Sequence, residues 1–392
     1  MVESYKREQI LILSGSLGEG HMQAAKAIVE ASSLYKPNVT VKVVDLMAWI
    51  HPRMHVIERY CFKQWVKHFP SLYGYLYQKT RADNPLTYLL KQFRTSSLQR
   101  LCKLIQDVKP SVLVSTFPPA SAAISMLKEK GLTNLRSVTV ITDHSDHSYW
   151  IHPNTDLYLV GSEEVQSALI RKGISDTKIS ITGIPVRPFH TQVSNKQRLR
   201  EKLGVDPSSF VVLVMGGGWG MIDDTFMEQL QSEHLSQVQF VIICGRNVKL
   251  MHRMHESLHD KHNVLLQGFV EGINEWMAVS DLLITKPGGL TTSEALAQQL
   301  PMLLFEPQLG QERDNAAYLI QKGVAKRCEV EGLPSQLNEM VQQPELLRQM
   351  REKAGACKQQ NSASLALTQI LKTTTSDSVA VDKNAVSIPQ YA

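Results

Sequence analysis

The chain has 392 residues, which is more than one ordinary hydrophobic core accommodates and enough for two domains. Hydrophobic residues make up 43% and charged residues 20%, a globular composition that argues against a disordered chain. No apolar run approaches the roughly 18 residues that a membrane-spanning helix needs. The net charge of +5 is modest.

The N-terminal stretch MVESYKREQI is charged and lacks the apolar core of a secretory signal. The five cysteines are scattered without CxxC spacing, at Cys61, Cys102, Cys244, Cys328 and Cys357. We therefore expect free thiols and a reducing, cytosolic environment.

Apolar runs alternate with helical patterns throughout the first half of the chain. Six strands are expected, at residues 9–15, 41–46, 111–116, 137–142, 155–161 and 178–183. The segments between them are long enough for crossover helices. This alternation predicts a doubly wound α/β domain with a parallel sheet.

Near residue 185 the stretch GIPVRPFH indicates a linker, after which the strand pattern restarts. Five further strands are expected, within residues 210–220, 238–247, 263–269, 281–289 and 301–307. We therefore predict two Rossmann-like domains that face a central cleft, at residues 1–187 and 188–372, and a disordered tail at 373–392. Ligands of such folds bind where strands end, so the functional residues are sought in those loops.

Residues 51–110 combine basic charge with aromatic side chains. The segment holds eleven Lys and Arg against three Asp and Glu, and it includes the stretch CFKQWVKHFPSLYGYLYQKT. This combination suits a surface that contacts anionic lipid headgroups. The alternative is a solvated helical face beside ordinary core aromatics.

The loop MGGGWG follows the first predicted strand of the second half. Its glycines Gly216, Gly217 and Gly218 would let backbone amides approach a phosphate, and the next helix start favours negative charge. The loop matches neither GxGxxG nor a Walker motif, so a plain tight turn is the alternative. Arg246 and Phe269 stand at the next two strand ends, where they would face a nucleotide.

The stretch ITKPGGLTTSEAL is the strongest signal in the sequence. Gly288 and Gly289 make a turn, the Thr and Ser residues at 291–293 offer helix N-caps, and a helix is predicted to begin with Glu294. A carboxylate there could accept both hydroxyls of a ribose. After the next strand, Gln311, Glu312 and Asn315 offer amide and carboxylate groups that suit a polyhydroxyl sugar.

These motifs, strand–KPGG–(T/S)xxE–helix followed by PxxGQExxNA, resemble the nucleotide-sugar half of GT-B glycosyltransferases. The nearest resemblance is to the diacylglycerol glucosyltransferase and monogalactosyldiacylglycerol synthase family, and the lipid II-forming GlcNAc transferase is more distant. The match covers most of residues 8–370. It implies a sugar contact for Gln311 and Glu312, with ribose binding by Glu294. The full set expected to bind UDP is Gly216, Gly217, Gly218, Arg246, Phe269, Gly288, Gly289, Thr291 and Glu294.

The N-terminal half resembles the same family in two loops. GSLGEGHMQAA is similar to its G-x-G-H-x-x-A-A loop, which implies that His21 is the catalytic base, with a pKa lowered by the helix start. Residues 141–156 resemble its T-D-x-x-x-H-x-x-W-x-H loop. Asp143 would orient His21 or share its role, and His147 and Trp150 would shape the acceptor side.

The same loop holds three histidines and three aspartates, which raises the possibility of a metal site. The histidines lack standard helical ligand spacing, and the family pattern requires no metal. We therefore expect no essential metal and no cofactor, since the UDP-sugar is a substrate.

The resemblance implies an inverting transferase that moves a hexose, with glucose favoured, from a UDP-sugar to diacylglycerol or a glycosyl-diacylglycerol. It would act as a peripheral protein on the inner face of the cell membrane, docked through residues 51–110. The alternatives are a soluble acceptor, a UDP-sugar epimerase and a non-catalytic UDP-sugar sensor. No nucleic-acid motif is present.

Overall fold

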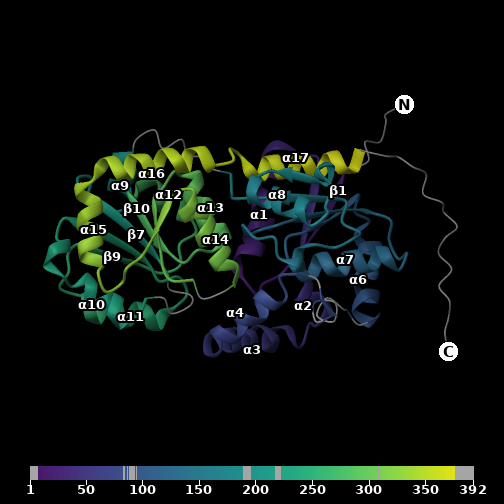
Figure 1. The fold of residues 1–392 in the computed structure, drawn as a ribbon, viewed down its shortest axis with the longest axis horizontal. Helices are drawn as coiled ribbons and strands as arrows, with labels where there is room; N and C mark the ends of the chain where they lie inside the picture. The colour runs from purple at the N-terminus through teal and green to yellow at the C-terminus, as the bar shows by residue number, and fades with distance from the viewer. Residues whose placement is uncertain are drawn as a thin grey trace.

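The computed structural model describes residues 8–375, apart from residues 83, 86, 88–92, 94, 189–195, 217–221 and 308–309. It contains two parallel six-stranded sheets, one from each half of the chain, with helices on both faces (Figure 1). The predicted α/β fold with two Rossmann-like units is confirmed. We call the units the N-terminal and C-terminal lobes. Of the expected disordered tail at 373–392, the first three residues belong instead to the last helix, and residues 376–392 lie outside the described residues.

The N-terminal sheet has the strand order β2-β1-β3-β4-β5-β6. Its strands are β1 (Gln9–Ser14), β2 (Thr40–Asp45), β3 (Val112–Ser115), β4 (Arg136–Val140), β5 (Leu157–Val160) and β6 (Ile179–Ile181). Ile10 and Ile12 of β1 pack into the core on one face, and Leu11 and Leu13 pack into the core on the other. Because both faces are buried, the strand is a continuous apolar run rather than an alternating one.

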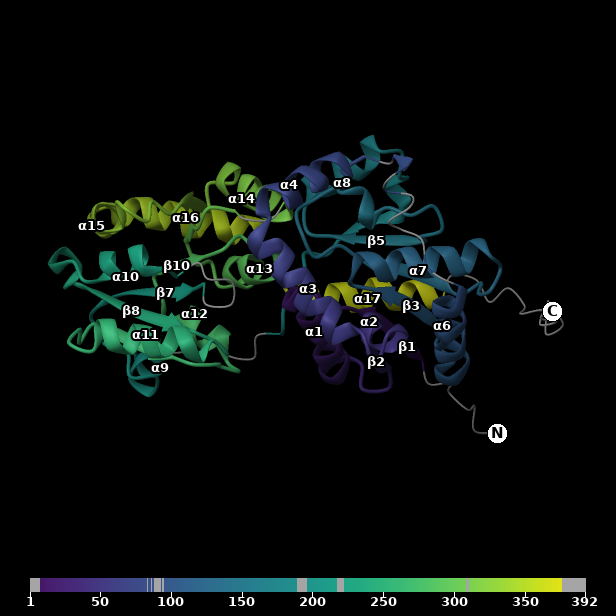
Figure 2. The ribbon, with the colours of Figure 1, turned by 90° about the horizontal axis from the view of Figure 1, so that it is seen from below.

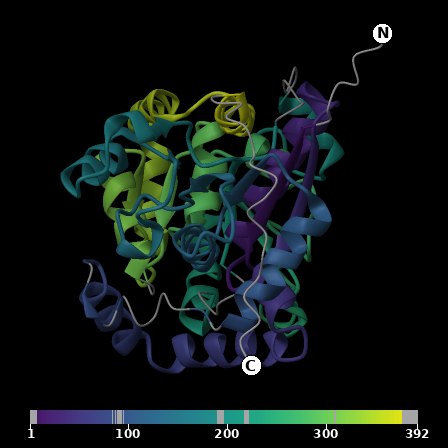
Figure 3. The ribbon, with the colours of Figure 1, turned by 90° about the vertical axis from the view of Figure 1, so that its right-hand side faces the viewer.

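The helices of this lobe are α1 (Glu19–Tyr35), α2 (Leu46–Ile50), α3 (His55–His68), α4 (Pro70–Lys79), α6 (Thr95–Val108), α7 (Pro118–Glu129) and α8 (Glu163–Arg171). Residues 46–108, from α2 to α6, stand between β2 and β3 and form what we call the helical insertion. Its helices α3 and α4 lie along one edge of the molecule, opposite the yellow helices at the C-terminal end of the chain (Figure 3). The basic, aromatic segment of the sequence is therefore helical, and its last helix, α6, packs into the core of the N-terminal lobe through Leu98 and Leu101.

The C-terminal sheet has the strand order β12-β11-β10-β7-β8-β9. Its strands are β7 (Phe210–Met215), β8 (Val238–Ile243), β9 (Val264–Gln267), β10 (Leu282–Thr285), β11 (Met302–Leu304) and β12 (Ala325–Arg327). The helices are α9 (Lys196–Lys202), α10 (Asp224–Leu230), α11 (Val248–Leu258), α12 (Ile273–Val279), α13 (Gly289–Ala297), α14 (Gly310–Gln321), α15 (Leu333–Gln342) and α16 (Pro344–Cys357). The edge strand β12 was not predicted.

The last helix, α17 (Ser362–Thr375), leaves the C-terminal lobe and packs on the N-terminal sheet (Figure 1). Ala363, Ala366, Leu367 and Ile370 are buried in the same core as Ile10. The predicted domain boundaries place this segment in the C-terminal domain, whereas it packs on the N-terminal lobe. The chain therefore crosses between the lobes twice. At the crossings the Val186 amide donates to Ser362 Oγ at 3.2 Å. None of the described helices is both long enough and apolar enough to span a bilayer.

Candidate functional site between the two lobes

The lobes meet where the strands of both sheets end, and one buried amide connects them. Asn315 of α14 is completely buried. Its Oδ1 accepts from the His144 amide at 2.7 Å, and its Nδ2 donates to Asp143 Oδ1 at 3.1 Å and to the Pro287 carbonyl at 3.0 Å. The loop after β4 is thereby tied to the KPGG turn. Asn315 is not available to a sugar hydroxyl, which corrects the expectation for this residue.

His21 lies on the N-terminal side of this junction. Its Nδ1 lies 2.9 Å from Thr142 Oγ1, and its ring packs against Phe117 and Trp150, with centroids 5.3 and 5.9 Å away. Gly15 leaves room for the Phe117 ring, since a Cβ there would lie 2.5 Å from it. Burial lowers the pKa of His21 to about 4, so the ring is neutral at pH 7. The lowered pKa agrees with the prediction, but burial is the main cause.

Asp143 follows Thr142 in the loop after β4, and its carboxyl group lies near other acidic side chains. Burial and the nearby Glu312 and Asp314 raise its pKa to about 6, although the hydrogen bond from Asn315 acts in the opposite direction. Near pH 7 the group is therefore ionised but easily protonated. The structure thus places two groups able to exchange a proton, His21 and Asp143, on either side of Thr142.

The start of α14 supplies the two predicted sugar-binding side chains. Glu312 is buried and accepts from Lys286 Nζ at 2.9 Å. Gln311 accepts at its Oε1 from the Tyr73 hydroxyl of α4 at 3.3 Å. Both residues lie in the first turn of α14, and Asn315 of the same helix donates to Asp143. Gln311, Glu312 and Asp143 therefore belong to one cluster.

Helix α13 begins at Gly289, not at Glu294 as the sequence predicted, and its N-cap is Gly288. Thr292 and Ser293 donate back to backbone carbonyls of residues 288 and 289 instead of capping the helix. Gly289 touches the other lobe, since a Cβ there would lie 2.1 Å from the Thr142 carbonyl oxygen. Only a residue without a side chain permits this approach.

Glu294 therefore lies in the second turn of α13, next to Thr291, which is partly buried. Burial raises the pKa of Glu294 to about 7, and the nearby Arg187 partly opposes this. The first turns of α13 and α1 also approach each other, because a Cβ at Gly20 would lie 3.6 Å from Leu290 Cβ. The positive ends of a helix from each lobe thus face the same gap.

The remaining predicted nucleotide residues lie at the ends of β7, β8 and β9. Gly216 is buried immediately after β7, and Gly217 and Gly218 lie outside the described residues. The Arg246 guanidinium stacks over the Phe269 ring at 4.6 Å, and the Phe269 side chain is 58% exposed. The exposed Phe269 ring, with the Arg246 guanidinium against it, can stack with a planar base at this strand end.

The predicted acceptor-side residues have internal partners. His147 accepts from the Tyr149 amide through Nδ1, and its Nε2 donates to the Tyr77 carbonyl at 2.9 Å. Trp150 is buried beneath His21. Both side chains therefore support the loop from within. Within the described ranges, no group of three or more His, Cys, Asp or Glu side chains is arranged to hold a metal ion.

Sequence reasoning missed the contribution of α4, which crosses to the C-terminal lobe beside α14 (Figure 2). The Tyr77 hydroxyl donates to Asp314 at 3.1 Å, and Arg81 donates to both oxygens of Asp314 at 2.8 and 3.0 Å. Arg81 also binds Asp146 at 2.6 Å. The aromatic and basic composition of this helix was the available signal, but it suggested a lipid surface or ordinary core aromatics and not a contact between the lobes.

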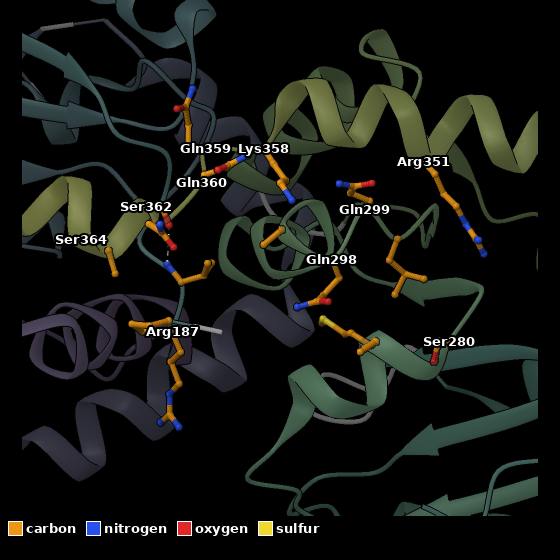
Figure 4. A pocket seen from close by; sticks show the side chains of 18 of the residues that line it. Arg187, Ser280, Gln298, Gln299, Arg351, Lys358, Gln359, Gln360, Ser362 and Ser364 are labelled. Carbon is orange, nitrogen blue, oxygen red and sulfur yellow. Dashed lines mark hydrogen bonds between the residues drawn. The ribbon is translucent and has the colours of Figure 1, made fainter. Parts of the chain in front are cut away.

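A cavity of about 670 Å³ lies instead beside the two chain crossings (Figure 4). Its lining includes Arg187, Lys196, Arg351 and Lys358. Lys196 and Arg351 are paired with Asp281, at 2.7 and 3.2 Å. None of the predicted catalytic or donor-binding residues lines this cavity, so it is distinct from the gap at His21.

The comparisons with known proteins agree with this architecture. Residues 21–186 match the family model described as monogalactosyldiacylglycerol (MGDG) synthase. Residues 211–370 match the model of the glycosyltransferase family 28 C-terminal domain. The two-lobed fold and these matches define a GT-B glycosyltransferase.

Curated relatives identify the family more narrowly. The processive diacylglycerol β-glucosyltransferase of Staphylococcus aureus strain MRSA252 is 32% identical over 82% of this chain and 81% of the relative. The Staphylococcus carnosus enzyme of the same name is 30% identical over 88% of each chain. This chain belongs to the family of these glucosyltransferases, as the sequence motifs had indicated.

Solved structures share the fold at low sequence identity. UGT71G1 of Medicago truncatula, complexed with UDP-glucose, has a TM-score of 0.60 and 12% identity over 95% of this chain and all of that one. The UDP-GlcNAc 2-epimerase of Neisseria meningitidis, bound to UDP-GlcNAc, has a TM-score of 0.57 and 16% identity over 93% and 99%. Transferases and an epimerase share this architecture, so the fold alone does not choose between them.

Gly289→Ala should disrupt the site without unfolding either lobe. The new methyl group would collide with the Thr142 carbonyl, and the lobes can relieve the collision by moving apart. We expect glucosyl transfer to fall roughly a hundredfold, as misplacement by about 1 Å can cause. Steady-state kinetics and thermal unfolding would measure both effects. Gly332→Ala, at the N-cap of α15 where a Cβ has room, is the control and should behave as wild type.

His144 should make the protein sensitive to acid. Both ring nitrogens are buried without hydrogen-bond partners among the described residues, the ring stacks on Tyr318 at 3.9 Å, and burial lowers its pKa to about 4. Below the ordinary histidine pKa of about 6.5, His144 is protonated in the unfolded state but stays neutral in the folded state. The free energy of unfolding therefore decreases as pH falls from about 6.5 to 4.

In His144→Phe this contribution disappears. The loss of unfolding free energy between pH 7 and pH 5 should shrink by up to about 2 kcal/mol, measured by urea denaturation. His252→Phe, which replaces an exposed histidine, should retain the wild-type dependence. An unchanged pH dependence in His144→Phe would contradict the assignment.

Proposed function

We propose that this protein transfers a hexose, with glucose favoured, from a UDP-sugar to diacylglycerol or a glycosyl-diacylglycerol, with inversion at the anomeric carbon. The observation that carries the proposal is the meeting of His21 and Asp143 from one lobe with α13 and α14 from the other. Family membership supports the substrates, because the curated relatives are named diacylglycerol β-glucosyltransferases.

The donor is proposed to bind mainly to the C-terminal lobe. Arg246 and Phe269 would meet the base, and Glu294 would accept from the ribose hydroxyls. The diphosphate would lie between Gly216 and the start of α13, where backbone amides and the helix dipole favour negative charge. Gln311 and Glu312 would hold the hexose beside Asp143.

In the proposed reaction the acceptor hydroxyl attacks the anomeric carbon from the face opposite UDP. His21 takes the hydroxyl proton as the new carbon–oxygen bond forms, and the bond to the diphosphate breaks with its electron pair leaving on UDP. The negative diphosphate would raise the basicity of the His21 ring once the donor is bound. Helix ends would stabilise the charge of the leaving group, so we propose that no metal is essential.

The acceptor is proposed to reach the site from the cytoplasmic face of a membrane. The helical insertion exposes a set of large apolar side chains that we call the apolar patch: Met54, Val56, Ile57, Tyr60, Phe69, Leu72 and Tyr75. Exposed cations, including Arg53 and Lys79, belong to the same element. Apolar side chains beside basic ones suit the interface of an anionic bilayer.

His21→Ala should lower kcat by about 10²- to 10⁴-fold, the range expected for loss of a general base. Binding of UDP, measured by calorimetry, should stay within twofold because His21 is not among the proposed nucleotide contacts. Labelled UDP-glucose and diacylglycerol vesicles, with lipid products resolved by chromatography, would measure turnover. His252→Ala, at an exposed position, is the control.

Three results would count against this assignment. If Asp143→Asn abolished turnover while His21→Ala kept it, the base would be Asp143, and kcat/KM should then fall below about pH 6, where its pKa lies. Release of altered or free sugar without any lipid would favour an epimerase. UDP-sugar binding with no turnover at all would favour a sensor.

The double variant Val56→Asp, Ile57→Asp should weaken membrane binding. It removes apolar area and adds negative charge facing anionic lipids, so sedimentation with phosphatidylglycerol-containing vesicles should fall at least about tenfold. Leu132→Asp alters another exposed apolar residue outside the insertion and should bind as wild type does. Equal binding by all three proteins would show that the patch does not dock.

A further inference from the structure

Tyr73 connects the helical insertion to the proposed donor site. It lies on α4, in the same element as the apolar patch, yet its hydroxyl donates to Gln311 Oε1 on α14 at 3.3 Å. Figure 2 shows α4 crossing from the insertion toward α14. A residue 238 positions earlier in the chain therefore contacts the side chain proposed to hold the hexose.

The Tyr73 ring is held by other aromatic rings of the insertion. Phe62 and Trp65 of α3 meet it edge to face, with centroids 6.2 and 5.6 Å away, and Tyr77 stacks beside it at 6.4 Å. Such contacts restrict the rotamer of the ring. The hydroxyl therefore has a fixed position relative to α14.

The surroundings of Tyr73 keep its hydroxyl protonated. Burial is the largest cause of its raised pKa, and the negative charges of Asp143 and Glu312 add to it. A phenol that keeps its proton can donate a hydrogen bond to an amide oxygen. Tyr73 is thus a donor rather than a base at this site.

This bond determines which end of the Gln311 amide is left for a ligand. The carbonyl oxygen is occupied by Tyr73, and no described protein group accepts from the amide nitrogen. Two N–H donors of Gln311 thus remain for a ligand, and the oxygens of sugar hydroxyls are suitable acceptors.

We propose that Tyr73 is a positioning residue for the donor sugar: it fixes the Gln311 amide so that its NH₂ group binds hydroxyl oxygens of the hexose. The inference rests on the proposed function, in which Gln311 contacts the sugar. It also means that the element proposed to touch lipid completes the donor pocket. Tyr73 acts on the hexose alone and leaves the UDP portion untouched.

The test compares Tyr73→Phe, Gln311→Ala and the double variant, each with UDP-glucose and with UDP. Tyr73→Phe keeps the ring and its packing but removes the hydroxyl. We expect KM for UDP-glucose to rise about three- to tenfold, the range for one lost hydrogen bond, with Kd for UDP unchanged in calorimetry. The double variant should match Gln311→Ala, because Tyr73 acts through Gln311. Tyr35→Phe, at an exposed position, should match wild type.

Each other outcome overturns the inference in a distinguishable way. If Gln311→Ala raises KM and Tyr73→Phe does not, Tyr73 has no positioning role although the proposed sugar contact stands. If Tyr73→Phe also weakens UDP binding, or adds its full effect to Gln311→Ala, its role is structural. If Gln311→Ala leaves KM unchanged, the assignment of Gln311 to the sugar fails and the inference fails with it.

Discussion

The arrangement of the reaction gap depends on the hydrogen bonds of one buried amide. Asn315 uses both of its N–H donors and its oxygen to connect the β4 loop, the KPGG turn and α14. Removal of such a group would leave several buried polar atoms unpaired, at a cost of about 1–3 kcal/mol each. Hydrogen bonds demand narrow geometry, whereas apolar contacts tolerate sliding. The position of Asp143 relative to Gln311 and Glu312 is therefore specified more closely than hydrophobic packing alone would allow.

The acidic groups at this junction differ in how far protein cations neutralise them. Asp314 is paired with Arg81, and Glu312 is paired with Lys286. Asp143 accepts from the Asn315 amide, and burial raises its pKa to about 6. Asp143 follows Thr142, which contacts His21. A carboxylate with a raised pKa therefore lies where the acceptor hydroxyl is proposed to react.

Much of the fold could be predicted because each central strand is buried on both faces. β1, β7 and β10 are continuous apolar runs that end in glycine or small polar residues. β12 could not be found in this way, since its sequence is Ala-Lys-Arg and only its alanine is buried. The choice of lobe by α17 also has no local signal. Its apolar residues fit any core, and only tertiary packing decides which one.

The candidate site was only partly predictable, because sequence motifs mark loops but not their partners. The two glycines before Glu294 indicated a turn, since glycine disfavours helices. In the structure Gly289 is the first residue of α13. A glycine is needed there because the carbonyl oxygen of Thr142, 147 positions earlier in the chain, leaves no room for a Cβ. Asn315 looked like a sugar ligand, but it serves the contact between lobes. Contacts of this kind depend on how two independently predicted units dock.

The helical insertion shows why composition alone assigned α4 incompletely. Tyr73, Tyr77 and Arg81 follow at intervals of four, which places them on one side of a helix and its end. All three bind side chains of α14. Leu72 and Tyr75 are exposed on α4 instead. The hydroxyls explain why the inward positions are tyrosines rather than phenylalanines, because an apolar ring could not satisfy Asp314 or Gln311. Aromatic residues that suggest a lipid surface thus include two that serve a polar contact. Spacing alone does not separate the two sets, because the exposed Phe69 stands four residues before Tyr73.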